Sequence, residues 1–407
     1  MRKLLFIAVL LPVVAGLGWW YFREQALPDY GPLYREYAYV TNGKSNTVSV
    51  IDLRTFALAK TIAVGGEPTG VAANSKKNEI YVVNTGSNNV SVIDAETNTV
   101  AATIGVHGRP YFIDVAEDGK RAYVANSGSS NVSVIDLEKR MVIGNLRVGS
   151  APGLARVSPD GSTVVVSNRG DNTVTVIDAK LLRVRATFPV CQQPEDIAIL
   201  PDSSKAFVAC SGSSQVASIQ LKGEARSEGQ SEVQSEAQPT TRKEDRLLAL
   251  LDVGRTPVSL TVKPDGGEMI VCNFDSDSIS IIETGNDEVG SSLEIGEHPS
   301  RGAVTLDNSR LYVTNFGSNS VAVYDIDIGR RIATLTVGSR PDSLALTPDQ
   351  NYLLVLDTQS GDVTVIQKRR ARKLEPTEYS LLTLIPVGMQ PNAIVVKAFM
   401  ASKKKKP

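Results

Sequence analysis

The side chains of this 407-residue chain that could bind or react with a ligand lie in turns between short apolar segments. Arginine is the commonest of them, and its guanidinium group can hold a carboxylate or a phosphate through two parallel hydrogen bonds. Gathered on one face, they would form a mouth for a carboxylate, a phosphate or an acidic glycan; the alternative is a variable loop surface with interspersed acids. The candidates are His107, Arg109, Tyr111, Arg169, Glu195, Asp196, Arg255, His298, Arg301, Arg340 and Asp342.

Patterns for catalysis or metal binding are sparse. His107 and His298 are the only histidines, and the chain has no H-E-x-x-H, G-x-S-x-G or C-x-x-C-H motif. An enzyme would need an acid/base cluster, for which Glu195, Asp196, His298 and Arg301 are the nearest candidates. We therefore expect no metal and no cofactor, and favour a non-enzymatic protein over a lactonase-like hydrolase.

Three cysteines occur, which is too few for a disulfide framework. Cys191 lies in a turn and Cys210 ends a strand of the next repeat, on the same predicted face. In an oxidising compartment they could form a disulfide. Cys272 lies within a strand, where a buried, inert thiol is expected.

A repeat must position all these residues. It is clearest as Tyr-Val-Thr-Asn at residues 39–42, and the spacing between copies is 42 residues except for one step of 63. The copies begin at Tyr39, Tyr81, Tyr123, Val165, Phe207, Ile270, Tyr312 and Leu354.

Each repeat contains four short β-branched segments separated by Gly, Asn, Asp and Pro, which predicts antiparallel strands. Examples are residues 70–73, 39–42, 48–52 and 61–65. A four-stranded unit cannot bury both faces alone, so the copies must stack around an axis. The sequence therefore predicts an all-β propeller with one N-terminal apolar helix.

Eight proline elements match the eight Tyr-Val-x-Asn elements: Pro68, Pro110, Pro152, Pro194, Pro257, Pro299, Pro341 and Pro391. The chain starts at a second strand and ends just after a first strand, at residues 392–396. We therefore expect eight blades, the last closed by N- and C-terminal strands, which removes an open edge. Seven blades with one displaced unit is the alternative.

Residues that recur in nearly every repeat must serve the blade. The Asp that ends the third strand, as at Asp52 and Asp94, should accept backbone hydrogen bonds in the following turn. The Asn that ends the second strand, as at Asn42 and Asn84, fits the same structural account. Only residues that break the pattern can mark a unique site.

The motifs Tyr-Val-Thr-Asn, Ser-Asn-x-Val-Ser-Val-Ile-Asp and Val-Gly-x-x-Pro resemble those of the YVTN-type β-propeller repeat proteins over about residues 37–399. This family includes surface-layer and periplasmic propellers, commonly seven-bladed, so eight blades would be a departure. The resemblance implies an exported scaffold that binds a protein, glycan or small ligand, without a shared catalytic set. A structural surface-layer subunit is a further alternative.

The N-terminus predicts export. Arg2 and Lys3 precede an uncharged run over residues 4–22, and Trp19, Trp20 and Tyr21 suit a membrane interface. The run is either an uncleaved anchor or a signal peptide cleaved after a small residue such as Gly16 or Gly18. The propeller would be extracytoplasmic: membrane-anchored, or periplasmic or secreted after cleavage.

Charge is balanced, with 43 Lys and Arg against 44 Asp and Glu, so no nucleic-acid partner is predicted. We expect a monomer. The predicted segments are an anchor or signal peptide (1–23), a linker (24–36), the propeller (37–399) with a disordered insertion (222–246), and a basic tail (400–407).

Overall fold

The computed structural model describes residues 31–222, 244–369 and 378–402. Residues 36–397 form one compact unit, and residues 31–35 with 398–402 belong to a second. In the second unit, the Ala401 N–H donates to the Leu33 carbonyl at 2.8 Å. The predicted apolar run (4–22), nearly all of the insertion and the terminal lysines lie outside the described residues. Within the described part, no helix is both long and apolar enough to span a membrane.

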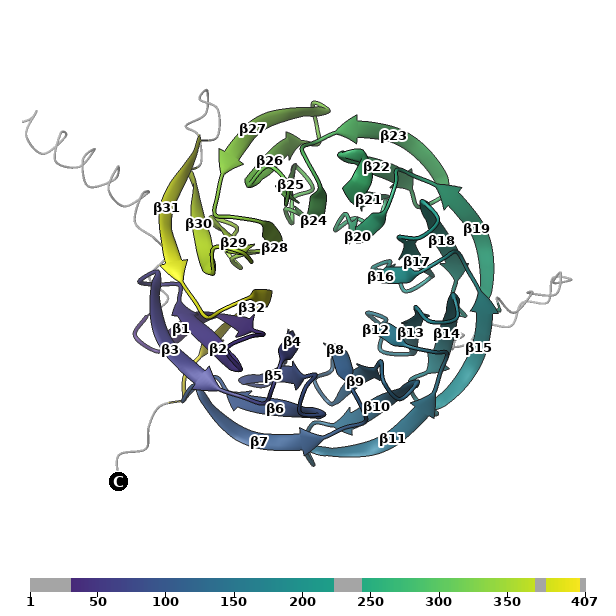
Figure 1. Ribbon diagram of the computed structural model, residues 1–407, viewed down its shortest axis with the longest axis horizontal. Coiled ribbons are helices and arrows are strands. Elements are labelled where there is room, and N and C mark those ends of the chain that lie inside the picture. The colour runs from purple at the N-terminus through teal and green to yellow at the C-terminus, as the bar shows by residue number, and fades with distance from the viewer. Residues whose placement is uncertain (1–30, 223–243, 370–377, 403–407) are drawn as a thin grey trace, which may run out of the picture. The chain divides into compact units, whose positions relative to one another are not determined.

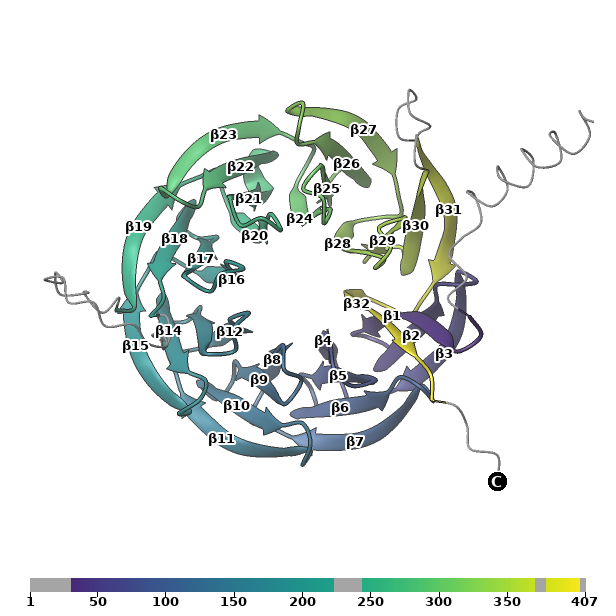
Figure 2. The same cartoon turned by 180° about the vertical axis from the view of Figure 1, so that it is seen from behind.

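The larger unit is a propeller of eight four-stranded antiparallel sheets around a central opening (Figures 1 and 2). Blade 1 consists of β32, β1, β2 and β3, and blades 2 to 8 follow in chain order from β4–β7 to β28–β31. The predicted eight blades are confirmed, and the seven-bladed alternative is wrong.

The strands fall into four classes from the axis outward. The innermost are β32 (Pro391–Met400), β4 (Pro68–Ala73), β8 (Pro110–Val115), β12 (Pro152–Val157), β16 (Pro194–Ile199), β20 (Pro257–Val262), β24 (Pro299–Val304) and β28 (Pro341–Leu346). The second are β1 (Tyr34–Asn42), β5 (Glu79–Asn84), β9 (Arg121–Asn126), β13 (Thr163–Asn168), β17 (Lys205–Cys210), β21 (Glu268–Asn273), β25 (Arg310–Asn315) and β29 (Tyr352–Asp357). The third are β2 (Thr47–Asp52), β6 (Asn89–Asp94), β10 (Asn131–Asp136), β14 (Thr173–Asp178), β18 (Gln215–Gln220), β22 (Ser278–Glu283), β26 (Ser320–Asp325) and β30 (Asp362–Arg369). The outermost are β3 (Ala57–Ala63), β7 (Thr99–Gly105), β11 (Met141–Arg147), β15 (Arg183–Pro189), β19 (Arg246–Asp252), β23 (Glu288–Glu294), β27 (Arg330–Thr336) and β31 (Glu378–Pro386). One 3₁₀ turn, η1 (Phe274–Ser276), follows β21.

Blade 1 closes the ring as predicted, because the C-terminal β32 completes the sheet begun by β1. The Gly43 N–H donates to the Gln390 carbonyl at 2.9 Å, and the Gly388 N–H donates to Asn42 Oδ1 at 3.0 Å. β1 begins at Tyr34, within residues 24–36, which were predicted as a linker.

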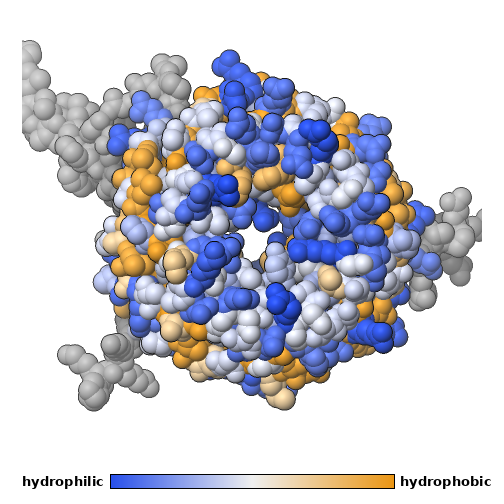
Figure 3. Space-filling view, in the orientation of Figure 1, coloured by the Kyte–Doolittle hydropathy of each residue, from blue (hydrophilic) through white to orange (hydrophobic). Residues whose placement is uncertain are grey.

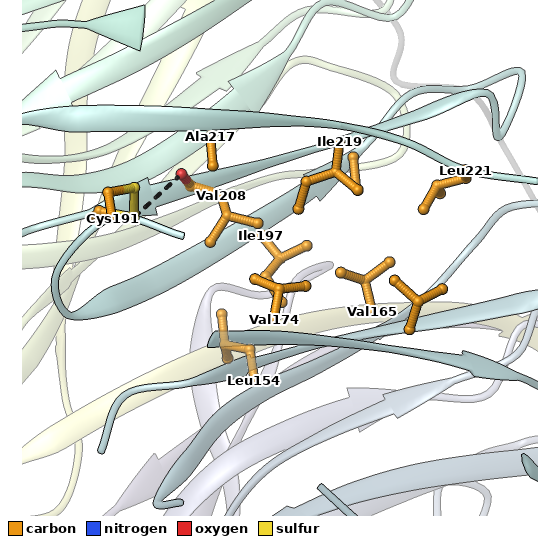
Figure 4. Close-up of a cluster of buried hydrophobic side chains, with 12 residues drawn as sticks. Leu154, Val165, Val174, Cys191, Ile197, Val208, Ala217, Ile219 and Leu221 are labelled. Atoms are coloured by element: carbon orange, nitrogen blue, oxygen red, sulfur yellow. Dashed lines mark hydrogen bonds between the residues drawn. A yellow bond between two sulfur atoms is a disulfide. The ribbon is translucent and has the colours of Figure 1, made fainter. Parts of the chain in front are cut away.

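Repeated side chains fill the space between neighbouring blades. Figure 4 shows one such core, where Val165 and Val174 of blade 4 meet Ile197, Val208 and Ile219 of blade 5. Burying one such side chain contributes about 2 kcal/mol. This packing fixes the blades rigidly enough to hold side chains on the axis.

The outermost strands differ from the sequence prediction. The first was expected over residues 61–65, but β3 spans Ala57–Ala63 and has one buried residue, Ile62. Because this strand faces solvent, its residues carry little apolar periodicity. Figure 3 shows hydrophobic residues on parts of the rim and mostly hydrophilic residues around the central opening.

Repeated polar residues serve the blades, as predicted. The Asp94 carboxylate accepts the Glu96 N–H at 2.8 Å in the turn after β6. The Asn84 amide donates to Asn89 Oδ1 at 2.7 Å and to Ser91 Oγ at 2.9 Å, which ties β5 to β6. These bonds recur in other blades and therefore do not mark a unique site.

Candidate ligand-binding site

The central channel contains a cavity of about 510 Å³ that touches the innermost strand of every blade. The backbone is the same from blade to blade, so only side chains distinguish its walls. Blade 2 contributes small residues such as Gly70 and Ala72, and β32 contributes Ala393. The charged side chains come from blades 3, 4, 5 and 7, whereas blades 1, 2, 6 and 8 contribute uncharged residues.

Asp196 on β16 is the centre of the charged wall. Its side chain is 6% exposed and accepts the Ile197 and Leu260 N–H groups, both at 3.0 Å. Arg301 on β24 lies 3.3 Å from its Oδ2, and Arg156 on β12 lies 4.0 Å from its Oδ1. Two guanidinium groups from different blades thus converge on one carboxylate that the backbone already satisfies.

A second pair lies beside this centre. Arg169, in the turn after β13, lies 2.8 Å from Glu195 on β16, and its guanidinium carbon lies 4.7 Å from the ring centroid of Tyr111. Burial raises the pKa of Glu195, the Arg169 charge opposes this shift and the Asp196 charge adds to it. Glu195 therefore keeps a proton to higher pH than a solvent-exposed glutamate.

Two further carboxyls flank the arginines. Asp114 on β8 accepts the Val115 N–H at 3.2 Å and the Val157 N–H at 3.0 Å. Burial raises the pKa of Asp114, against the charge of Arg156. Burial likewise raises the pKa of Asp342, against the charge of Arg301. Both shifts reduce the negative charge next to the two arginines at a given pH.

The structure places the predicted site residues in four locations. Tyr111, Arg169, Glu195, Asp196 and Arg301 line the channel cavity. His298 and Arg340 line a different cavity near the turns of blades 6 to 8. His107, Arg109 and Arg255 are exposed turn residues outside both cavities, while Asp342 lies near Arg301.

The proposed acid/base cluster is not assembled. His298 lines the second cavity, whereas Glu195, Asp196 and Arg301 line the channel. His298 lies in the turn before β24 of blade 7, whereas Glu195 and Asp196 lie on β16 of blade 5. Among the described residues, no three His, Cys, Asp or Glu side chains are grouped to hold a metal ion.

Sequence reasoning missed Asp114, Arg156 and Phe112 on the innermost strands. Arg156 lies 4.4 Å from the centroid of the Phe112 ring, which helps to orient its guanidinium group. A signal was present: the positions matching Asp114 and Arg156 are alanine in four other repeats, at Ala72, Ala198, Ala303 and Ala345. The prediction considered turns and overlooked strand positions that face the axis.

Blade 5 carries a disulfide between Cys191 and Cys210, whose Cα atoms lie 5.6 Å apart. These two positions are Gly149 and Asn168 in blade 4, where a Cβ added to the glycine would lie 2.6 Å from the Asn168 Cγ. The fold thus points the two side chains at each other. Cys272 is free and buried, and burial raises the pKa of its thiol to about 12.

Two family models match parts of the chain. A model of YNCE-like β-propellers matches residues 20–155, and a model of seven-bladed lactonase β-propellers matches residues 291–382. Each covers less than half of the chain, so they support a propeller without assigning one family. No curated protein matches the chain by sequence.

Solved structures share the fold at low sequence identity. A chain of Kuenenia stuttgartiensis hydrazine synthase is 21% identical, with 81% of this chain and 91% of that chain covered and a TM-score of 0.54. Dihydro-heme d1 dehydrogenase NirN in complex with DHE is 14% identical, with 88% and 74% covered and a TM-score of 0.67. A candidate 6-phosphogluconolactonase from Bacteroides fragilis is 17% identical, with 81% and 97% covered and a TM-score of 0.54. These likenesses concern the fold alone, because one fold hosts many functions.

Proposed function

We propose that this protein is a non-enzymatic, extracytoplasmic binding propeller that holds a small anionic ligand in its central channel. The observation that carries the proposal is the convergence of Arg156 and Arg301 on the single carboxylate of Asp196. That carboxylate already accepts two backbone N–H groups. The arginines therefore retain positive charge and hydrogen-bond donors for a ligand.

The geometry suits a carboxylate or phosphate. The Arg301 and Arg156 side chains are 41% and 33% exposed, so neither is sealed in a buried ion pair. A guanidinium group has five N–H donors, and the contacts to Asp196, at 3.3 and 4.0 Å, leave donors unused. Charge-assisted hydrogen bonds to such donors are about twice as strong as neutral ones.

Two features support placement outside the cytoplasm. The apolar run over residues 4–22 follows two basic residues, as in a secretory or anchoring segment. The Cys191–Cys210 disulfide suits an oxidising compartment. In this setting the propeller presents its channel to ligands on the outer side of a membrane.

Titration calorimetry with the full-length protein tests the channel site. We expect gluconate, 6-phosphogluconate or inorganic phosphate to bind and glucose not to bind. Replacing Arg301 by Gln should weaken binding roughly 10- to 100-fold, because a hydrogen bond to a charged group is worth about 1.5–3 kcal/mol. Arg255→Gln, which changes an exposed turn arginine outside the channel, is the matched control and should bind like the parent.

Two results would contradict the proposal. One is equal binding by the parent and Arg301→Gln, which would place any ligand elsewhere. The other is hydrolysis of 6-phosphogluconolactone by the parent that is lost in Glu195→Gln, which would make the protein an enzyme.

A further inference from the structure

The turns of blades 6 to 8 carry a second cavity, of about 420 Å³, that shares no lining residue with the channel. Four of its side chains form an aromatic and cationic cluster: Phe274, His298, Phe316 and Arg340. Ser339, Gln359 and Glu297 add polar groups. A site in this cavity would be separate from the proposed channel site and independent of it.

The two phenylalanines have no role in the repeat. The positions equivalent to Phe274 and Phe316 are small or polar in the other repeats: Gly43, Thr85, Ser127, Arg169, Ser211 and Thr358. Both rings are only partly buried. Their centroids lie 5.8 Å apart, and the His298 ring stacks on Phe274 at 4.6 Å and 29°. Exposed aromatic rings that the core of the repeat does not require are typical of a recognition site.

The Arg340 guanidinium group lies over an aromatic ring and has no carboxylate partner among the described residues. Its guanidinium carbon lies 5.4 Å from the Phe316 centroid, and its backbone N–H donates to Asn319 Oδ1 at 2.8 Å. Its side chain is exposed, and no carboxylate of the described residues pairs with it. The ring orients the guanidinium group while its N–H edge stays available to an anion.

The polar groups add both donors and acceptors. Ser339 donates to the Gln359 side-chain oxygen at 3.2 Å, which leaves the Gln359 amide N–H groups as donors. The Glu297 carboxylate can only accept hydrogen bonds when ionised. A ligand that uses all of these groups must carry hydroxyl groups as well as an anionic group and an apolar ring face.

We propose that this cavity binds a sugar acid, meaning a six-membered sugar ring with a carboxylate, as in a uronic acid residue of an acidic glycan. The C–H face of the ring packs against Phe316, because the negative face of an aromatic ring attracts C–H groups. Arg340 takes the carboxylate through two parallel hydrogen bonds. Gln359, Ser339 and Glu297 bond the ring hydroxyls.

Ligand-observed NMR on the full-length protein tests this assignment with three probes. Glucuronate has the ring, the hydroxyls and the carboxylate; glucose lacks the carboxylate, and benzoate lacks the hydroxyls. We expect glucuronate to bind at least tenfold more tightly than either. Equal binding of glucose, tighter binding of benzoate or no binding of glucuronate would overturn the assignment.

Paired variants locate the binding site. Phe316→Thr restores the residue that two other repeats carry at this position, at Thr85 and Thr358, so the fold should tolerate it. Phe316→Thr and Arg340→Gln should each weaken glucuronate binding at least tenfold. Arg109→Gln, at the position equivalent to Arg340 in blade 3, is the control and should have no effect.

The channel and the second cavity are distinguished by Arg301→Gln. Because the channel can also take a carboxylate, Arg301→Gln should remove only the share of glucuronate that binds there. The binding that remains should be weakened at least tenfold when Arg340→Gln is added. Loss of glucuronate binding in Arg301→Gln, with Arg340→Gln unaffected, would move the sugar acid to the channel and refute the second site.

Discussion

Asp357 in blade 8 occupies the position at which most other blades carry asparagine. In blade 2 the Asn84 amide donates to β6, but in blade 8 Asp357 is fully buried and accepts the Thr364 hydroxyl at 2.6 Å. Burial, reinforced by neighbouring Asp362, raises the pKa of Asp357 to about 8. We infer that a proton on the Asp357 carboxyl replaces the donor that asparagine supplies elsewhere.

This substitution should make folding pH-dependent. The raised pKa stabilises the fold below the unfolded-state pKa of about 3.9, and that contribution is lost as the pH rises through about 8. Asp357→Asn should remove the loss, so the variant's stability relative to the parent should rise by on the order of 2–5 kcal/mol between pH 4 and pH 9. Urea unfolding of both proteins at the two pH values measures this difference. Asp362→Asn removes the charge that reinforces the raised pKa of Asp357, so this variant should also lose less stability than the parent as the pH rises. Parallel pH curves for Asp357→Asn and the parent would refute the proton on the Asp357 carboxyl.

Among the elements, blade 5 is unusual because a disulfide fixes the turn that leads into its first strand. In most other blades a glycine at the first of the two cysteine positions packs against an asparagine at the second. The disulfide joins the turn before β16 to the end of β17 across a sequence separation of 19 residues. Because the same pair of positions faces each other in the six blades that carry glycine at the first of them, a cysteine pair fits without changing the backbone path.

We expect Cys210→Ser to lower the free energy of unfolding by roughly 3 kcal/mol, as the loop-closure entropy predicts. The double variant Cys191→Gly with Cys210→Asn restores the Gly149 and Asn168 pair of blade 4 and should recover part of this loss. Thermal unfolding of the three proteins, with the parent also measured in a reductant, checks both statements. A double variant less stable than Cys210→Ser would show that blade 5 depends on the bond itself.

At the scale of the whole molecule, the ring is completed by its two chain ends, since β32 supplies the axis-facing strand of blade 1. Axis-facing side chains therefore come from the full length of the chain. Arg301 and Asp196, for example, are 105 residues apart in sequence and meet across blades 5 and 7. A channel site of this kind requires the closed ring.

Export of the whole molecule predicts one free thiol in the full chain. When cells producing the protein are quenched in acid and the denatured protein is treated with a thiol-reactive polymer, Cys272 alone should be labelled, because Cys191 and Cys210 are joined. Deleting residues 1–23 should retain the protein in the reducing cytoplasm, where all three thiols should be labelled. Three labels on the full chain would contradict export.

The repeat in the sequence was sufficient to predict the architecture. Blade number, ring closure and the structural role of Asp94 and Asn84 all follow from strand alternation and turn residues at fixed spacing, which are local properties of the chain. Breaks in the repeat also pointed to Arg169, Glu195, Asp196 and Arg301 in the channel. The outermost strands were less predictable, because solvent exposure removes their apolar pattern.

Which of the pattern-breaking residues meet depends on the three-dimensional arrangement of the blades. This arrangement added Asp114 and Arg156 to the channel, moved His298 and Arg340 to a separate cavity, and supplied that cavity with Phe274 and Phe316. Such groupings depend on how far each side chain reaches from its blade and on which blades face each other around the ring. Packing between the blades sets both the reach of the side chains and the pairing of blades across the ring. The spacing of residues along one repeat encodes neither property.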